Sequence, residues 1–364
     1  RKSERKIQTY RIMQWLNSVP TSQSDRLLGT RATIDLRIMD LSTHAPLSMP
    51  IQVIHGKKPG PTLFVCAALH GDEVNGVEII RRLTQLSALK RIKGTLLAAP
   101  IVNVFGFLAH ARYLPDRRDL NRSFPGSPQG SLAGRLAHLF LEEVVARSTH
   151  GIDIHTGAVH RTNFPQIRAD LDDEETFNLA RIFGVPIVIN AGLRAGSLRE
   201  QAGQHGVRVL VYEAGEALRF DETCIRAGLK GIVRVMRSLG MLPPSKRTQK
   251  LNEPIIIRNS RWERAPMSGV FRAILSPGAD VRLGDHLGII SDPFGDTEMT
   301  VTSRSDGVIV GRTMLPVVNE GDALFHIGIY EGIKASADAL DAFEPDDDYD
   351  TGATAEIAAE PPIV

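Results

Sequence analysis

The chain is poor in cysteine and aromatic residues and has no long apolar run. Only Cys66 and Cys224 are cysteines among 364 residues, so a disulfide framework is improbable and reduced thiols are expected. No apolar run approaches the roughly 18 residues of a membrane span, and no stretch suited to a signal peptide follows the first residues. We therefore expect a soluble cytoplasmic protein.

An excess of either charge is also missing, because 43 Lys and Arg residues balance 42 Asp and Glu residues. This balance argues against a general electrostatic grip on nucleic acid or on an anionic membrane. We expect a small-molecule substrate as the partner, and homo-oligomer formation stays open. A chain of 364 residues exceeds what one hydrophobic core usually fills, which predicts a second domain.

Short apolar runs alternate with amphipathic stretches through the first two thirds of the chain. The pattern predicts strands at residues 31–40, 62–69, 94–100, 151–155, 185–190 and 207–212, and helices at 73–89, 130–147 and 174–183. Strands that alternate with helices indicate an α/β sheet with helices packed on both faces.

The pattern changes after about residue 245, where Gly and Pro punctuate short apolar runs and no helical period is present. Three segments, 268–271, 277–280 and 284–287, recur as 306–309, 316–320 and 321–324. Two copies of one hairpin unit predict a small barrel with approximate two-fold symmetry, which resembles the biotinyl/lipoyl-like sandwich fold. The hairpin tip at 294–298 lacks the lysine of a carrier domain, so a structural or lid-forming role is expected.

These patterns divide the chain into four parts. We predict an N-terminal extension at 1–45, an α/β domain at 46–245, a C-terminal β domain at 250–332 and a tail at 335–364. The tail is rich in Asp, Glu, Ala and Pro and has too little apolar content to fold alone, so we expect it to be disordered.

Two predicted strands end in motifs that suit a metal ion. His70-Gly71-Asp72-Glu73 follows the strand at 62–69, and Asp153-Ile154-His155 ends the strand at 151–155. Ligands of α/β proteins gather at the carboxyl ends of strands. Two His and one Glu leave a fourth position for water, which is typical of a catalytic zinc.

Two further polar segments carry groups suited to hydrolysis. In the loop at 119–126, Arg122 offers a planar fork for a carboxylate and Asn121 adds a donor. Glu213 and Glu216 follow the strand at 207–212, and either could serve as general base, with Glu213 nearer the strand end.

Taken in order, the segments His-Gly-Asp-Glu, Asp-Leu-Asn-Arg-x-Phe-Pro-Gly, Asp-x-His-Thr-Gly and Glu-x-Gly resemble the succinylglutamate desuccinylase/aspartoacylase family. This family is related to the zinc carboxypeptidases, the M14-type hydrolases, and the resemblance runs from about residue 61 to 215. It implies a mixed central sheet flanked by helices in a zinc hydrolase domain. It also implies that the C-terminal β barrel-sandwich domain overhangs the active-site mouth.

The resemblance also implies roles for individual residues. It implies one Zn²⁺ per subunit, held by His70, Glu73 and His155, with Glu213 as the general base. The remaining implied roles are a substrate carboxylate held by Asn121 and Arg122, a histidine-orienting acid at Asp119, and a carbonyl-polarising arginine at Arg112. The loop between Arg112 and Arg122 is slightly longer than in the best-known members, so Arg117 and Arg118 stay open for that last role.

We therefore expect a zinc-dependent amidohydrolase that deacylates a small N-acyl amino acid or related carboxylate-bearing amide. A metallocarboxypeptidase would use the same zinc, Arg and Glu, and a catalytically silent binding protein is a third reading. His160, Arg161, Asn163 and Arg168 follow the second zinc histidine and are candidates for lining the substrate pocket.

Overall fold

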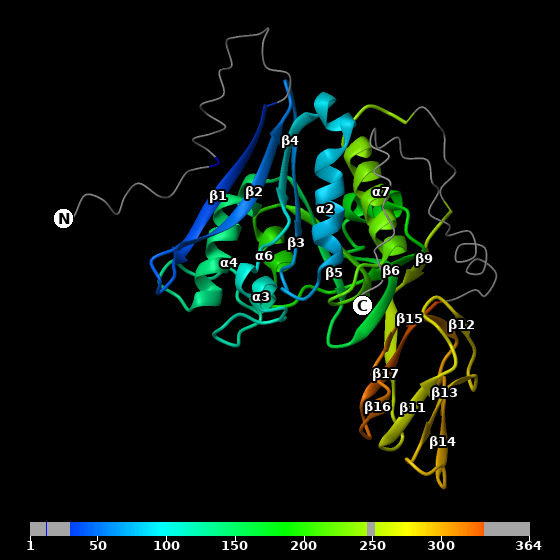
Figure 1. The fold of residues 1–364 in the computed structure, drawn as a ribbon. Helices are drawn as coiled ribbons and strands as arrows, with labels where there is room; N and C mark the ends of the chain where they lie inside the picture. Colours follow the sequence, from blue (N-terminus) through cyan, green and yellow to red (C-terminus); the bar gives the residue numbers. More distant parts are fainter. Residues whose placement is uncertain (1–11, 13–29, 246–251, 331–364) are drawn as a thin grey trace, which may run out of the picture.

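The computed structural model of the chain describes residue 12 and residues 30–245 and 252–330. One large sheet runs through the molecule, with strands in the order β1-β2-β4-β3-β5-β8-β6-β15-β17-β10, and a second, four-stranded sheet lies at the C-terminal end (Figure 1). Parallel and antiparallel pairs both occur in the large sheet, so the predicted mixed α/β architecture is confirmed.

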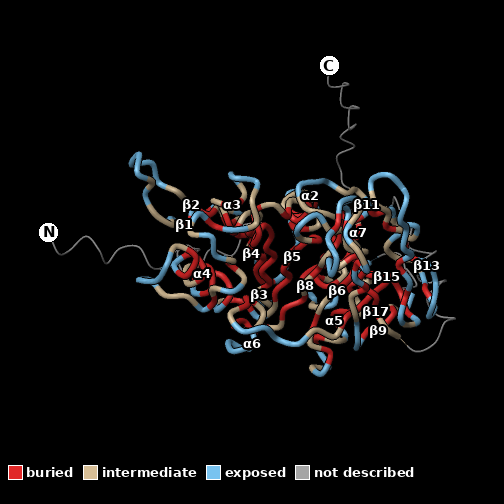
Figure 2. Tube along the Cα trace, turned by 90° about the horizontal axis from the view of Figure 1, so that it is seen from below, coloured by how far each residue is buried: buried red, intermediate tan, exposed pale blue. Residues whose placement is uncertain are grey.

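The centre of the large sheet is parallel and buried. β3 pairs in parallel with β4 and β5, and β5 pairs in parallel with β8, whereas β6 is antiparallel to β8. Buried residues concentrate along these strands (Figure 2). The strands are β1 (Thr30–Asp40), β2 (Pro46–His55), β3 (Lys58–Ala67), β4 (Lys93–Ala99), β5 (His150–Gly157), β6 (Arg161–Ala169), β7 (Ile187–Asn190) and β8 (Arg208–Glu216).

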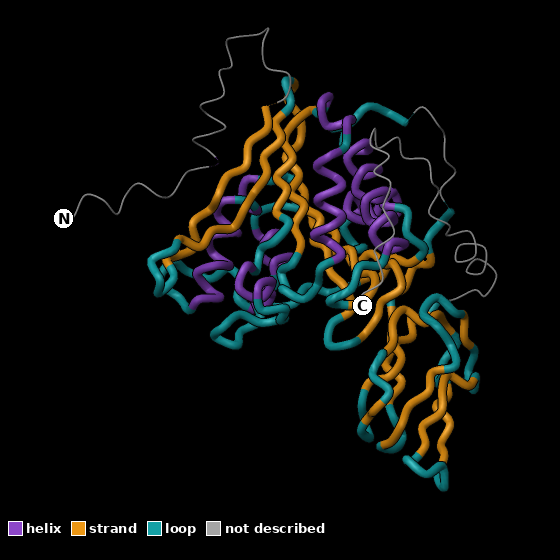
Figure 3. The backbone as a smooth tube through the Cα atoms, viewed as in Figure 1, coloured by secondary structure: helices purple, strands orange, loops and turns teal. Residues whose placement is uncertain are grey.

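Helices pack on both faces of this sheet, as predicted (Figure 3). One face carries α2 (Asn75–Gln85), α5 (Glu174–Phe183) and α7 (Glu222–Ser238); the other carries α4 (Leu132–Glu143) and α6 (Leu198–Gln204). Side-chain oxygens of Asp173, Ser197 and Asp221 accept from the first turns of α5, α6 and α7 and so start those helices. The described helices include none with the length and apolarity to cross a membrane.

Two predicted helices end earlier than expected. Leu86 adopts extended backbone angles and stops α2, and a 3-10 turn at Ser87–Arg91 follows. In the same way α4 ends at Glu143, and the 3-10 turn Val145–Arg147 follows. The apolar pattern continued through both turns because their side chains still pack on the core.

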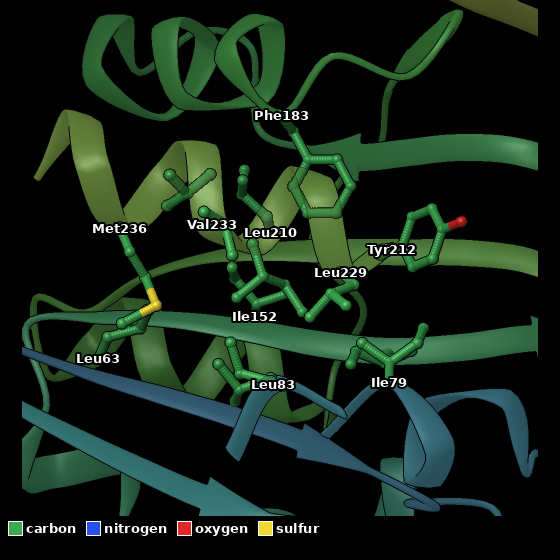
Figure 4. Packing of buried hydrophobic residues seen from close by; sticks show 14 of the residues in the cluster. Leu63, Ile79, Leu83, Ile152, Phe183, Leu210, Tyr212, Leu229, Val233 and Met236 are labelled. Atoms are coloured by element: carbon green, nitrogen blue, oxygen red, sulfur yellow. The ribbon is translucent and has the colours of Figure 1, made fainter. Parts of the chain in front are cut away.

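Each face of the sheet has its own apolar layer. On one face, Leu63, Ile152 and Leu210 of the strands pack against apolar side chains of α2 and α7 (Figure 4). On the other face, Phe64 of β3 meets Phe140 of α4 edge to face, with ring centroids 6.2 Å apart. Both layers remove apolar surface from water, which is the main source of stability in such a fold.

The C-terminal part, residues 254–330, contains strands and no helix (Figure 3). β11 pairs with β16 while β12 pairs with β15, which is the reciprocal arrangement that two related hairpin units produce, so the predicted internal repeat is confirmed. The strands are β9 (Ile255–Ile257), β10 (Asn259–Arg264), β11 (Gly269–Ala273), β12 (Asp280–Val281), β13 (His286–Ser291), β14 (Glu298–Thr302), β15 (Gly307–Thr313), β16 (Val317–Val318) and β17 (Ala323–Ile329).

Main-chain hydrogen bonds join strands of this part to strands of the α/β part, so that both contribute to the large sheet. β15 pairs antiparallel with β6, with Gly311 opposite Asn163, and β9 pairs in parallel with β7. Met314 N also donates to the carbonyl of His160 at 2.8 Å. Such ladders favour a fixed wall over a swinging lid. The domain boundaries at 45/46 and 250/332 stay predictions, and the tail at 335–364 lies outside the described residues, as does most of 1–29.

Candidate active site

The chain places His70 and Glu73 in a tight turn between β3 and α2. Glu73 N donates to the carbonyl of His70 at 3.1 Å, and α2 begins two residues later at Asn75. A Cβ at Gly71 would lie 1.9 Å from the carbonyl carbon of Gly106 in α3 (Val104–Leu108). Only glycine at position 71 therefore lets the backbone of α3 approach this turn so closely. The glycine at position 71 is therefore a local backbone requirement of this turn.

His155 comes from β5, the parallel neighbour of β3. Ligand atoms of His70, Glu73 and His155 all lie within 4.8 Å of one another, and all three residues are buried. The structure thus brings together the three residues that the sequence predicts, as a group that could hold a metal ion.

A carboxylate orients each imidazole ring. His70 Nε2 donates to Asp119 Oδ1 at 3.1 Å, and His155 Nε2 donates to Asp153 Oδ2 at 2.8 Å. With the Nε2 atoms engaged in these hydrogen bonds, the Nδ1 atoms face the carboxylate of Glu73. Nδ1 of His70 lies 2.9 Å from Oε1, and Nδ1 of His155 lies 2.8 Å from Oε2. Carboxylate–histidine pairs of this kind fix the tautomer that leaves one ring nitrogen for a metal.

The donor set fits a zinc ion. Nδ1 of His70 is buried, and although it lies 2.9 Å from Glu73 Oε1, it has no well-directed hydrogen bond within the described part of the chain. Two imidazole nitrogens and one carboxylate are a common set for catalytic zinc. A cation bound between this nitrogen, the carboxylate of Glu73 and the imidazole of His155 would give the nitrogen the partner that it lacks.

The electrostatics of the group favour positive charge at its centre. Burial alone would raise the pKa of Glu73, but the imidazoles of His70 and His155 hold that pKa well below its usual range. Burial alone would likewise lower the pKa of His155, yet the carboxylates of Asp153 and Glu73 raise it well above its usual value. A bound cation would supply the positive charge beside Glu73 that protonated imidazoles of His70 and His155 otherwise supply.

Arg112 is the arginine that reaches this centre. Its guanidinium bonds to Glu73 Oε1 at 3.0 Å and to Asp119 Oδ2 at 3.1 Å, and it lines the same pocket. Arg117 and Arg118 are exposed and do not line that pocket. The location therefore favours Arg112 among the three arginines that the sequence left open.

Asn121 and Arg122 line the same pocket. Asn121 Oδ1 accepts from Leu198 N at the start of α6, at 2.9 Å, so its amide is oriented by a helix terminus. Arg122 donates to the main-chain carbonyl of Asn121 at 2.5 Å. The two side chains are adjacent donors of the kind that bind a carboxylate.

Glu213 faces the pocket from within β8. Its Oε2 accepts from Asn163 Nδ2 at 2.8 Å and lies 3.1 Å from Arg168 Nε. Glu216 does not line the pocket and pairs instead with Arg219. One expectation was wrong in detail, because β8 runs to Glu216 and Glu213 is inside the strand rather than after it.

The pocket has a volume of about 590 Å³ and is walled partly by the C-terminal strands. Trp262 of β10 stacks on His326 of β17, with ring centroids 4.6 Å apart, and Arg161 Cζ lies 5.0 Å from the Trp262 ring centroid. Ser260 Oγ shares a hydrogen bond with His326 Nε2 at 2.8 Å. The arginines that line the pocket are Arg112, Arg122, Arg161, Arg168, Arg194 and Arg199.

Comparison with known proteins matches residues 59–239 to the succinylglutamate desuccinylase/aspartoacylase catalytic domain. The chain belongs to this family. A curated relative, the N-alpha-acetyl-L-2,4-diaminobutyric acid deacetylase of Halomonas elongata, is 25% identical over 299 residues, which cover 78% of this chain and 86% of the relative. Family membership and this relative support a hydrolase of the deacylase type.

Solved structures of the family share the fold. A succinylglutamate desuccinylase/aspartoacylase from Rhodobacter sphaeroides has a TM-score of 0.73 at 24% identity and covers 83% of this chain and 96% of its own. The product-bound ectoine utilization protein from Ruegeria pomeroyi has a TM-score of 0.74 at 24% identity, and the match covers 86% of this chain and 98% of that protein. Likeness at this level establishes the architecture, including the C-terminal β part.

Within this family fold, several pocket residues were not predicted as functional. Asp153 could have been found, because it lies two positions before His155 and strand alternation puts both side chains on one face. Trp262 and His326 carried no comparable sequence signal. Of the four residues predicted after His155, Arg161, Asn163 and Arg168 line the pocket, whereas His160 does not.

Proposed function

We propose that this family member is a zinc-dependent amidohydrolase that deacylates a small N-acyl amino acid or related carboxylate-bearing amide. One observation carries the proposal: the group His70, Glu73 and His155 shares a single pocket with the carboxylate of Glu213 and the donors of Asn121 and Arg122. That pocket thus contains a metal-ligand set, a base and an anion-binding pair.

His70, Glu73 and His155 would hold one Zn²⁺ per subunit. When bound, zinc supplies a Lewis acid that polarises a carbonyl oxygen and brings the pKa of a coordinated water close to neutrality. Asp119 and Asp153 keep the two imidazole rings in the tautomer that such binding requires.

Glu213 would act as the general base. It would take a proton from the attacking water and later deliver that proton to the leaving nitrogen. Asn163 donates a hydrogen bond to its Oε2 and Arg168 forms an ion pair with the same oxygen, which leaves Oε1 as the oxygen for proton transfer. Arg112 would stabilise negative charge on the carbonyl oxygen during the attack, as donors at such positions do.

Asn121 and Arg122 would hold the substrate through its carboxylate and so orient the amide. A pocket of about 590 Å³ with a wall of Ser260, Trp262 and His326 supports a small substrate rather than a long peptide. The curated relative's name, a deacetylase of an N-acetyl amino acid, supports the same class.

A substrate panel tests the proposal. Zinc-loaded enzyme is incubated with N-acetyl, N-succinyl and N-formyl amino acids, including Nα-acetyl-L-2,4-diaminobutyrate, beside dipeptides with a free C-terminus. We expect release of free amino acid from N-acyl substrates and none from a Glu213→Gln control. Cleavage confined to the dipeptides would make the protein a carboxypeptidase, and a zinc stoichiometry near zero would favour a silent binding protein.

A further inference from the structure

Cys66 and Asp153 are neighbours across the parallel pair β3–β5, where they stand opposite each other in the register. Directly opposite residues point to the same face of a sheet, and Asp153 and His155 share that face because they are two positions apart. Cys66 is fully buried and Asp153 is 1% exposed. The three side chains therefore form a row in the protein interior.

Each oxygen of the Asp153 carboxylate has one donor in this row. Oδ2 accepts from His155 Nε2 at 2.8 Å, and Oδ1 accepts from the Cys66 thiol at 3.3 Å. Within the described residues, no other hydrogen bond to this carboxylate is present. The Asp153 carboxylate orients His155, and its own orientation thus depends on the hydrogen bond from the Cys66 thiol.

A buried carboxylate with an unsatisfied oxygen is costly, so the thiol contributes more than volume. Burial first and the Asp153 carboxylate second raise the pKa of the Cys66 thiol well above its usual value, so the thiol keeps the proton that it donates. Cys66 also packs in the apolar layer with Phe64 and Leu69, a role that a small apolar residue could fill equally well. Packing alone therefore does not explain the hydrogen bond.

We propose that Cys66 is a positioning residue for the metal centre, holding the Asp153 carboxylate, and through it the ring of His155, in the orientation that metal binding needs. The proposal rests on the proposed metal site. It does not depend on which bond the enzyme cleaves.

Two substitutions at Cys66 separate hydrogen bonding from packing. Cys66→Val keeps apolar volume and removes the donor, whereas Cys66→Ser keeps a donor and loses apolarity. Loss of a group that orients a metal-binding histidine typically weakens metal affinity by about 10- to 100-fold, and we expect Cys66→Val to lie near the lower end, at about 10-fold. Cys66→Ser should stay within about 3-fold of wild type, since a hydroxyl is the stronger donor.

The measurement is the dissociation constant for Zn²⁺ and Co²⁺ by chelator competition. The matched controls are Cys224→Val and Cys224→Ser, because Cys224 is also buried but lies in α7 beside Asp221. Among the described residues it has no hydrogen bond to Asp153 or to the metal-ligand group. Both controls should leave metal affinity unchanged. Thermal unfolding of the metal-free proteins is followed in parallel, and Cys66→Ala replaces Cys66→Val if the latter does not fold.

A double-mutant cycle tests the route through Asp153. If Cys66 acts through that carboxylate, Cys66→Val should weaken metal binding in the wild type and add nothing in an Asp153→Asn background. Proton NMR of the metal-free protein gives a second readout, since the downfield signal of His155 Nε2–H should weaken or shift in Cys66→Val and persist in Cys66→Ser.

A purely structural role predicts the opposite ranking: Ser would lower thermal stability most, and Val would leave metal affinity and the NMR signal intact. That result would overturn the proposal. Absence of turnover on every N-acyl substrate, with metal affinities ranked as expected, would instead count against the proposed function and leave the role of Cys66 standing.

Discussion

His155 and Glu213 stand opposite each other in the parallel pairing of β5 with β8. Adjacent strands lie about 4.8 Å apart, and opposite side chains point to the same face. A metal-ligand candidate and the proposed base are thus held by the sheet itself rather than by loops. Sites built on strands keep their geometry more closely than sites built on loops.

Replacing Glu213 by Gln should abolish most turnover and leave metal content unchanged. The variant keeps an acceptor for Asn163 but cannot take a proton, and general-base catalysis is typically worth about 10²–10⁴ in rate. Steady-state kinetics and metal analysis measure the two effects. Glu216→Gln, at a residue that does not line the pocket, is the control and should retain wild-type rates. Wild-type turnover in Glu213→Gln would refute the assignment.

Removing the His155 imidazole should remove the metal. His155→Ala leaves His70 and Glu73 as the remaining ligands, which is too few for a stable catalytic zinc site. We expect a zinc stoichiometry near zero after dialysis, with the far-ultraviolet circular dichroism of the wild type. Replacement of His150, which is on the same strand but pairs with Glu175, serves as the control. Retention of full zinc by His155→Ala would contradict the ligand set.

Asn121→Asp should discriminate against substrates that carry a carboxylate. The new side chain still offers an acceptor to Leu198 N, so the start of α6 is preserved, but it places a negative charge where a donor stood. Like charges in contact cost several kcal/mol, so we expect kcat/KM for an N-acyl amino acid to fall by about 100-fold or more. The matched N-acyl amino acid amide should lose much less. Equal losses on both substrates would place the substrate carboxylate elsewhere.

His326 should make the protein less stable as the pH falls below neutrality. Burial first, and the guanidinium groups of Arg168 and Arg161 next, lower the pKa of His326 to about 3. The unfolded chain, with a histidine pKa near 6.5, then binds more protons than the folded chain between about pH 6.5 and 3. Stability therefore decreases through that window as the pH falls, by up to about 1.4 kcal/mol per pH unit from this group.

Chemical unfolding of the wild type and of His326→Phe, followed from pH 8 to pH 4, measures this contribution. Phenylalanine keeps the stacking on Trp262 and cannot be protonated. The difference in unfolding free energy between the two proteins should be constant above about pH 7.5 and should shift in favour of the variant below pH 6.5. Parallel curves over the whole range would show that His326 titrates normally in the folded protein.

Much of the candidate site could be predicted from the sequence because its signals are local. His70 and Glu73 belong to one turn, Asp153 and His155 to one strand, and each segment follows an apolar run that marks a buried strand. The helix ends were less predictable, since the apolar pattern of α2 continues into the 3-10 turn that follows Leu86. Periodicity reports which side chains are buried, and it does not report where the backbone leaves the helix.

By itself, the sequence determined the α/β class, the repeat of the C-terminal strands and the three residues of the metal-ligand candidate. Only the tertiary structure decided which arginine reaches that centre and that Trp262 and His326 wall the pocket. It also decided that the Cys66 thiol meets Asp153, 87 residues away in the chain. The physical reason is that strand register and the pairing of β6 with β15 arise from packing between distant segments, which no local period encodes.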